Sequence, residues 1–184
     1  INLDDEIFID QLNPFPEYDD PRNIQAGNPK LLPEYIHSVE LGCEMKGKKN
    51  SFMPTLYYRN TYNGFTTVTK PINDSTLLTT QENLSSSQDA GLELIFSGKL
   101  SSWISGNLSS NIFYNQIDAS NLGYSSNMST FSYITNLSAN IATSKHTAFQ
   151  LNFFYHSEEL TPQGKHLPGY MLNLGAKQEL WKNR

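Results

Sequence analysis

The sequence has little of what metal sites, disulfide scaffolds and nucleic-acid-binding proteins need. Cys43 is the only cysteine, so no intrachain disulfide and no Cys-x-x-Cys metal site can be built. Charged residues make up only 17% of the chain, against about 25% in ordinary soluble proteins. Lys and Arg number 13 against 18 Asp and Glu, so the net charge is -5 and no basic stripe is available to neutralise phosphates. Nucleic acid is therefore excluded as an expected partner.

Long apolar runs are also missing. No stretch approaches the 18 or so residues that a transmembrane helix requires. This does not exclude a membrane, because membrane β-strands need only about 9–11 residues each and carry their signal as alternation. What the chain does have is aromatic residues, with 10 Tyr, 10 Phe and 2 Trp, together with many uncharged polar residues. Both features favour strands over helices.

The chain divides by pattern into two parts. Residues 1–33 contain five prolines and no clear periodicity, so we expect an irregular loop segment there, with a short extended piece over Glu6–Leu12. Residues 34–184 change character, because apolar and polar residues alternate with period 2 through seven runs. The expected runs are 35–45, 52–61, 91–97, 104–115, 131–141, 149–156 and 170–179. Pro54 cannot donate a ladder hydrogen bond, which favours a bulge in the second run.

The connections between these runs alternate in length. Short polar turns at 47–50, 98–101 and 144–146 alternate with long stretches at 63–87, 116–128 and 157–168. Aromatic residues gather beside both kinds of connection. Phe52, Trp103, Phe149 and Trp181 lie beside the short turns; Tyr35, Tyr62, Tyr114, Phe131, Tyr155 and Tyr170 lie beside the long ones. Outer-membrane barrels combine short periplasmic turns, long extracellular loops and two aromatic girdles.

We therefore predict an all-β fold: an antiparallel up-and-down meander of about seven strands, part of a transmembrane β-barrel in the bacterial outer membrane. The alternative is a soluble cell-surface β-sandwich that serves as a binding module or adhesin, whose strands also alternate. Four leucines on the apolar faces distinguish the two folds. A barrel wall places Leu41, Leu94, Leu137 and Leu174 outward on one curved sheet, whereas a sandwich buries them between two sheets.

Several short motifs resemble a known family. They are Leu12-Asn13-Pro14-Phe15, Asp19-Asp20-Pro21, Gly27-Asn28-Pro29, Leu32-Pro33-Glu34-Tyr35, Ser38-Val39-Glu40-Leu41-Gly42, Ser87 to Leu94, Pro162-Gln163-Gly164 and Gly169-Tyr170. Together they are similar to the outer-membrane β-barrel family of Bacteroidetes, within the TonB-dependent receptors. The resemblance covers nearly the whole chain, although each motif is only a few residues long.

The resemblance implies a longer receptor, with a plug domain inside a barrel of about 22 strands. Seven strands leave two unpaired edges, so we expect this chain to be a C-terminal barrel fragment. The implied function is import of a small nutrient ligand, with energy from a periplasmic coupling protein that contacts regions outside this sequence. Outer-membrane lipid is the implied surroundings, and self-association is expected for the isolated fragment.

No catalytic, cofactor or metal pattern stands out. His37, His146, His156 and His166 lack HxH or HExxH spacing, and the acidic residues of the N-terminal segment lack the calcium-loop pattern. A Ser/His/acid set could be drawn from Ser157, His156 and Glu158, but adjacent strand residues point to opposite faces. We therefore expect neither an enzyme nor a cofactor.

Ligand contacts are expected in the long connections, because extracellular loops carry specificity in the receptors that the chain resembles. The candidates are Tyr62, Phe65 and Tyr124. Tyr62 has a second interpretation, as a member of the aromatic girdle at the membrane interface.

Overall fold

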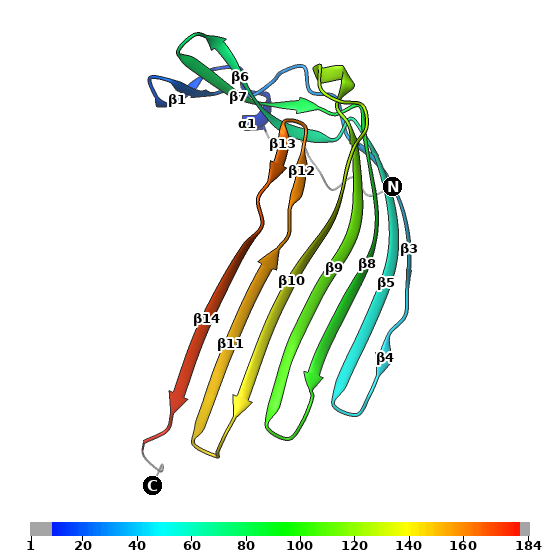
Figure 1. Ribbon diagram of the computed structural model, residues 1–184, viewed down its shortest axis with the longest axis vertical. Helices are drawn as coiled ribbons and strands as arrows, with labels where there is room; N and C mark the ends of the chain where they lie inside the picture. Colours follow the sequence, from blue (N-terminus) through cyan, green and yellow to red (C-terminus); the bar gives the residue numbers. More distant parts are fainter. Residues whose placement is uncertain (1–8, 181–184) are drawn as a thin grey trace.

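The computed structural model describes residues 9–180 and is dominated by one curved antiparallel sheet (Figure 1). Its strands are β3 (Tyr35–Gly42), β5 (Asn50–Tyr62), β8 (Ser86–Lys99), β9 (Ile104–Asp118), β10 (Met128–Ala142), β11 (Thr147–His156) and β14 (Gly169–Gln178), and the short β4 (Met45–Lys46) also pairs with β5. Each long strand pairs with the preceding and following long strand of the chain. The predicted up-and-down meander of seven strands is thus confirmed.

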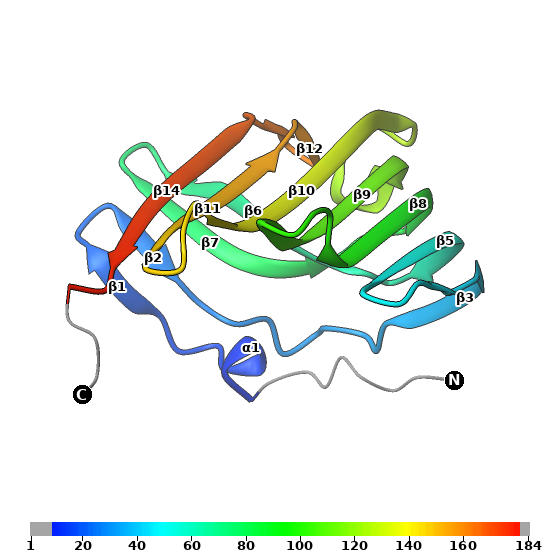
Figure 2. The same cartoon turned by 90° about the horizontal axis from the view of Figure 1, so that it is seen from below.

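The sheet has an apolar face and a polar face, because paired residues point to the same side of a ladder. Leu41 is in register with Leu56, and the same row continues through Leu92 and Ile112. Leu41 is 74% exposed and Leu174 is 76% exposed on this face. The leucines therefore lie outward on a single sheet, as the barrel wall predicts, and are not buried between two sheets. Figure 2 shows the curvature of this sheet.

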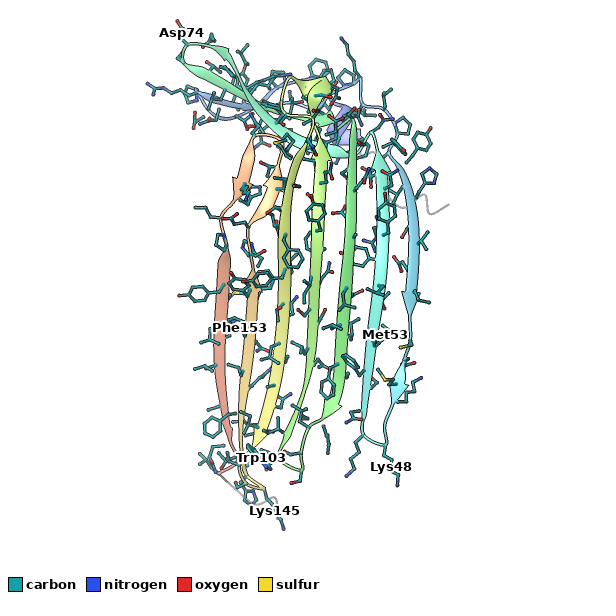
Figure 3. All side chains as sticks on the ribbon, turned by 45° about the vertical axis from the view of Figure 1, so that its right-hand side comes forward. Lys48, Met53, Asp74, Trp103, Lys145 and Phe153 are labelled. Atoms are coloured by element: carbon teal, nitrogen blue, oxygen red, sulfur yellow. The ribbon has the colours of Figure 1, made fainter. Side chains whose placement is uncertain are left out.

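The height of the apolar face matches a membrane. On β10, the apolar side runs from Phe131, beside a long connection, to Ile141, which pairs with Phe149 near the short turns. Ten residues of strand span roughly 33 Å along the chain. At a barrel tilt of about 40°, this gives about 25 Å of height, the thickness of the apolar band of outer-membrane barrels. Trp103 lies at the turn end of the sheet, where an interfacial girdle is expected (Figure 3).

The expected bulge at Pro54 is wrong. The pairing of β5 with β8 runs through Pro54 and Leu94 without a shift of register. The effect of the proline falls on the other side of β5, where the ladder breaks between β3 and β4. There the N–H of Cys43 donates to the Pro54 carbonyl at 3.2 Å, but Pro54 has no N–H with which to complete the pair.

A second, smaller sheet lies across the long-connection end of the large one (Figure 1). Its order is β1 (Glu17–Asp20), β2 (Asn23–Gln25), β7 (Thr76–Asn83) and β6 (Phe65–Asn73), with β2 and β7 parallel. The third long connection forms the hairpin of β12 (Glu159–Thr161) and β13 (Gly164–His166), and the second contains the 3-10 turn η1 (Ser120–Leu122).

These elements correct two expectations. Residues 1–33 are not wholly irregular, since they contribute β1 and β2. The extended piece over Glu6–Leu12 is wrong where the structure describes it, because Ile9–Leu12 is the one-turn helix α1; residues 6–8 lie outside the described part. Ile9 and Leu12 are three residues apart, a spacing that places them on one face of a helical turn but on opposite faces of a strand. A single turn is too short for a periodic pattern to separate these two structures.

Candidate functional site

The long connections form one compact unit, here called the cap: residues 9–34, 63–85, 119–127 and 157–168. It contains the main buried apolar cluster of the described chain, built on Leu84, Ile117 and Ala119, which are 7%, 5% and 0% exposed. The partly buried residues packed against it are Leu122, Tyr124, Met128 and Leu160. These residues come from all three long connections or the strand ends beside them, so the connections pack as one body.

Gln163 joins the three connections through hydrogen bonds. The backbone N–H of Thr69 donates to its Oε1 at 2.8 Å, and its Nε2 donates to the Thr69 carbonyl at 2.7 Å. The same Nε2 donates to the Tyr124 hydroxyl at 3.0 Å. Thr69 lies on β6, the edge strand of the small sheet, so the Gln163 amide satisfies backbone groups that an edge strand leaves unpaired.

Asn83 ties the N-terminal segment to the first long connection. Its Oδ1 accepts from the Leu32 backbone N–H at 2.8 Å, while its Nδ2 donates to the carbonyls of Leu32 at 3.0 Å and Asn63 at 2.6 Å. The Phe65 backbone N–H donates to Glu34 Oε2 at 3.0 Å. Residues 28–34 are therefore held against the hairpin of β6 and β7 before the chain enters β3.

The tight turn between β1 and β2 is held by Asp20. Its Oδ1 accepts from the backbone N–H groups of Arg22 at 2.7 Å and Asn23 at 3.0 Å, and its Oδ2 accepts from the Asn23 side-chain amide at 2.8 Å. The Asn23 side-chain hydrogen bond is the largest cause that lowers the pKa of the Asp20 carboxyl, followed by the backbone hydrogen bond from Arg22. The ionised form of Asp20 therefore favours this turn.

A groove of about 310 Å³ lies between residues 11–17 and the small sheet. Its lining is mainly uncharged and polar, with four side-chain amides, three threonines and one carboxylate, Glu17. Phe15, which is 75% exposed, supplies the one aromatic ring. A hydrogen bond from the Gly27 backbone N–H to the Asn13 carbonyl at 2.7 Å joins the two walls of the groove. Within the sheet wall, Gln81 Nε2 donates to Thr67 Oγ1 at 3.0 Å.

The three candidate ligand contacts occupy different settings. Tyr62 is 46% exposed at the end of β5 and makes an edge contact with His37, with ring centroids 6.2 Å apart. Phe65 is half-buried at the start of β6. Tyr124 packs on the buried cluster of the cap and accepts a hydrogen bond from Gln163. Their ligand contacts stay predictions, and none of the three residues lines the groove described above.

Sequence reasoning assigned no role to Phe15, Asn83 or Gln163. Phe15 lies in the Leu12 to Phe15 motif and Gln163 in the Pro162 to Gly164 motif, so the sequence motifs already drew attention to both positions. Their roles depend on tertiary contacts, since Gln163 is 94 residues from Thr69 and Asn83 is 51 residues from Leu32. No local periodicity can predict contacts of that range.

The polar face of the large sheet is charged in one half. Arg59 Nη2 lies 3.0 Å from Glu40 Oε1, and the Arg59 guanidinium carbon lies 4.9 Å from the centroid of the Tyr57 ring. Farther along the face, the Tyr57 hydroxyl donates to Asn111 Oδ1 at 3.0 Å and Asn115 Nδ2 donates to Asp89 Oδ1 at 2.6 Å. Arg59, Glu40 and Asp89 thus have polar partners within the wall.

The other half of the polar face is neutral in its middle, with Lys99 and Lys177 near the short-turn end. One register row crosses β8 to β14 with only hydroxyl and amide side chains: Ser97, Asn107, Ser138, Asn152 and Asn173. Ser97 Oγ donates to Asn107 Oδ1 at 2.6 Å, and Ser138 Oγ donates to Asn152 Oδ1 at 2.9 Å. These residues line a hollow of about 340 Å³ together with apolar residues of the same face, Ile95, Phe154 and Met171. The hollow marks the polar face as the concave one.

The possible Ser/His/acid set has the wrong contacts for an activated nucleophile. His156 Nδ1 lies 3.2 Å from the Ser157 carbonyl oxygen, whereas the Ser157 hydroxyl donates to the Glu158 carbonyl at 3.2 Å and accepts from the Tyr133 backbone N–H at 2.8 Å. A base must reach the hydroxyl to activate it.

Within residues 9–180, no group of three His, Cys, Asp or Glu side chains is placed to hold a metal ion. No helix in this part of the chain is long and apolar enough to cross a membrane.

The curved sheet, its exposed aliphatic band, the two aromatic ends and the polar concave face together define the wall of a transmembrane β-barrel. The chain belongs to the outer membrane protein beta-barrel family, whose model matches residues 8–184. The protein is thus a component of the bacterial outer membrane.

A solved receptor has a similar fold. The structure of a Q482A mutant of the ferric enterobactin receptor from Pseudomonas aeruginosa, in complex with enterobactin, aligns with a TM-score of 0.51 and 16% sequence identity. The alignment covers 88% of this chain and 26% of the receptor, so the chain spans about a quarter of that receptor's length. A comparison with curated proteins found no match.

Proposed function

We propose that this chain is the C-terminal part of the barrel of a TonB-dependent receptor that imports a nutrient across the outer membrane. The observation that carries the proposal is the cap: three long connections packed into one body at the end of a barrel wall. A cap of this kind suits capture of a ligand from outside the cell. The fold similarity to a ferric enterobactin receptor supports the same class, without specifying the ligand.

In this proposal the wall and the cap have separate roles. The apolar face anchors the sheet in lipid, the polar concave face lines the lumen, and the cap contacts the ligand. Energy comes from a periplasmic coupling protein that contacts a part of the receptor outside this sequence. The short motifs of the N-terminal segment favour an origin in Bacteroidetes. We propose no catalytic role, because Ser157 and His156 lack the contact that would activate a nucleophile.

Deletion of the receptor gene in the source bacterium tests this function. Parent and deletion strains are grown with iron, cobalamin or a glycan as the limiting nutrient, and growth on one of them is expected to fail. A plasmid copy of the gene should restore growth only while the periplasmic coupling protein is present. Normal growth of the deletion strain on every limiting nutrient, or rescue without the coupling protein, contradicts the proposal.

A further inference from the structure

We infer that the imported ligand is an uncharged, hydroxyl-rich molecule of the saccharide class, and that the groove between residues 11–17 and the small sheet is its binding site. This inference rests on the proposed function and specifies the ligand. It starts from the lining of the groove, which offers side-chain amides and threonine hydroxyls and includes no Lys or Arg. Amides and hydroxyls both donate and accept, so they match neighbouring sugar hydroxyls, which do the same.

Phe15 gives the groove an apolar surface as well. The residue is 75% exposed although its segment is held by hydrogen bonds on its N-terminal side and by the pairing of Glu17 with Gln25 on its C-terminal side. The Phe15 backbone N–H donates to Asn13 Oδ1 at 3.1 Å, and the Asn28 backbone N–H donates to the Gln11 carbonyl at 2.6 Å. The exposed ring therefore lies on a fixed backbone, where it can cover the C–H face of a sugar ring. Such a combination of one apolar surface and a few oriented polar groups is typical of small-molecule sites.

The charge of the cap argues against an anionic ligand. By sequence, the four segments of the cap hold nine Asp or Glu and only four Lys or Arg. Two of the four basic residues are already paired with carboxylates, Lys70 with Glu82 at 2.9 Å and Lys165 with Glu158 at 2.8 Å. A surface of one sign repels ligands of the same sign and slows their approach. Anionic ferric complexes and uronic acids are thus disfavoured relative to neutral molecules.

The concave face carries a neutral polar row as well. The row from Ser97 to Asn173 has only hydroxyl and amide side chains across five strands. A neutral, hydroxyl-rich molecule can exchange hydrogen bonds with side chains of this kind.

Binding to an oligosaccharide array tests the inference. The full chain is refolded in the sugar-free detergent lauryldimethylamine oxide, because maltoside or glucoside detergents would compete for the groove. It is then applied to neutral glucans, mannans and xylans beside oligogalacturonate and heparin fragments. We expect saturable binding to at least one neutral glycan and none to the anionic ones.

The matched variants are Phe15→Ala and Tyr18→Ala. Both rings are exposed and belong to the same segment, but only Phe15 lines the groove. Phe15→Ala should weaken binding to the neutral glycan at least tenfold, and Tyr18→Ala should leave it within twofold. Gln81→Ala, which removes an amide from the groove wall, should also weaken binding while the sheet stays folded by circular dichroism.

Binding to none of the neutral glycans, preference for the anionic ones, or equal losses in the two aromatic variants overturns the inference. These results would leave the proposed import function standing if the deletion strain still fails on a limiting nutrient. Conversely, the chain could bind a neutral glycan while deletion of its gene leaves growth unchanged. That result would reject the proposed import function but retain the inferred ligand class. The two failures are therefore distinguishable.

Discussion

The side-chain amide of Gln163 pairs with both backbone polar groups of Thr69, 94 residues earlier in the chain. It acts on β6 as one residue of an additional strand would, and it reaches the Tyr124 hydroxyl with the same nitrogen. The first, second and third long connections thereby meet at a single side chain. This contact acts together with the buried cluster of Leu84, Ile117 and Ala119 to hold the three connections in one arrangement.

Replacing Gln163 by alanine should loosen the cap without unfolding the wall. Each lost hydrogen bond contributes about 0.5–1.5 kcal/mol to local stability. We expect faster hydrogen–deuterium exchange in residues 65–73 and 119–127, with unchanged exchange in β9 and β10. Tyr124→Phe is the matched control, since it removes only one of the three bonds and should have a smaller effect. Unchanged exchange in the Gln163 variant would show that the packed cluster alone holds the cap.

An added charge should destabilise the protein much more on one face of β14 than on the other. Leu174→Lys places an ammonium on the apolar band near mid-membrane, at a cost of about 2–4 kcal/mol. Asn173→Lys places it one residue away on the concave face, where water is available, and should cost far less. Unfolding in urea from lipid vesicles measures both values. Equal destabilisation would mean that both faces of this strand meet the same surroundings.

The isolated chain should self-associate in plain buffer. Its apolar face exposes Leu41, Leu56 and Leu174 by more than half, and contiguous apolar patches of this kind drive association. The edge strands β3 and β14 also leave backbone groups unpaired. Light scattering should detect oligomers in buffer and a defined species in detergent. A monodisperse, cooperatively folding monomer in buffer contradicts the expectation.

Ser132 provides a test of burial at the junction of wall and cap. Its side chain is 1% exposed, and its Oγ donates to the Glu158 carbonyl at 2.6 Å. Ser132→Ala removes this donor from a buried acceptor and should cost about 1–3 kcal/mol of unfolding free energy. The control is Ser129→Ala, an exposed serine on the same strand, which should change stability by no more than about 0.5 kcal/mol. Equivalent melting of the two variants would rule out a structural role for the buried bond.

The turn between β1 and β2 should weaken in acid. Because the folded pKa of Asp20 is lowered, its contribution to stability is fully present above the ordinary carboxyl pKa of about 3.9 and is lost as the pH falls through the lower, folded value. Asn23→Ala removes the largest cause of the shift, so the Asp20 pKa should rise toward its ordinary value. Carbon-detected NMR titration measures this, with Asn73→Ala in the β6–β7 turn as control. An unchanged Asp20 pKa in Asn23→Ala would assign the shift to the backbone hydrogen bonds.

The wall could be predicted from sequence, whereas the cap could not. Alternation along single strands, such as Phe149, Leu151 and Phe153 opposite Gln150 and Asn152, already specifies which face each residue occupies. The short turns then determine the antiparallel neighbours. The small sheet of the cap depends instead on the three-residue parallel pairing of β2 with β7, between segments some 54 residues apart. With three residues, β2 is too short to show a period, and parallel partners need no turn between them.

The charged interior pairs show a similar limit. Arg59 and Glu40 both fall on the predicted polar face, but their contact follows from the register of β3 with β5, which pairs Arg59 with Ser38 and not with Glu40. The ion pair is therefore diagonal. Sequence alone gives the face and approximate depth of such residues; the partner depends on side-chain reach across the ladder.

Strand stagger gives the neutral row on the concave face a direction. Phe52, beside the short turns, is in register through Phe96, Leu108 and Leu137 with Phe153 near the middle of β11. Rows of paired residues therefore slant across the membrane and do not run level. The row that starts at Asn173, midway along β14, ends at Ser97 close to the turn after β8. The neutral row thus approaches the short turns as it crosses from β14 to β8, and on the wall of a barrel such a slanted row follows a helical course about the axis.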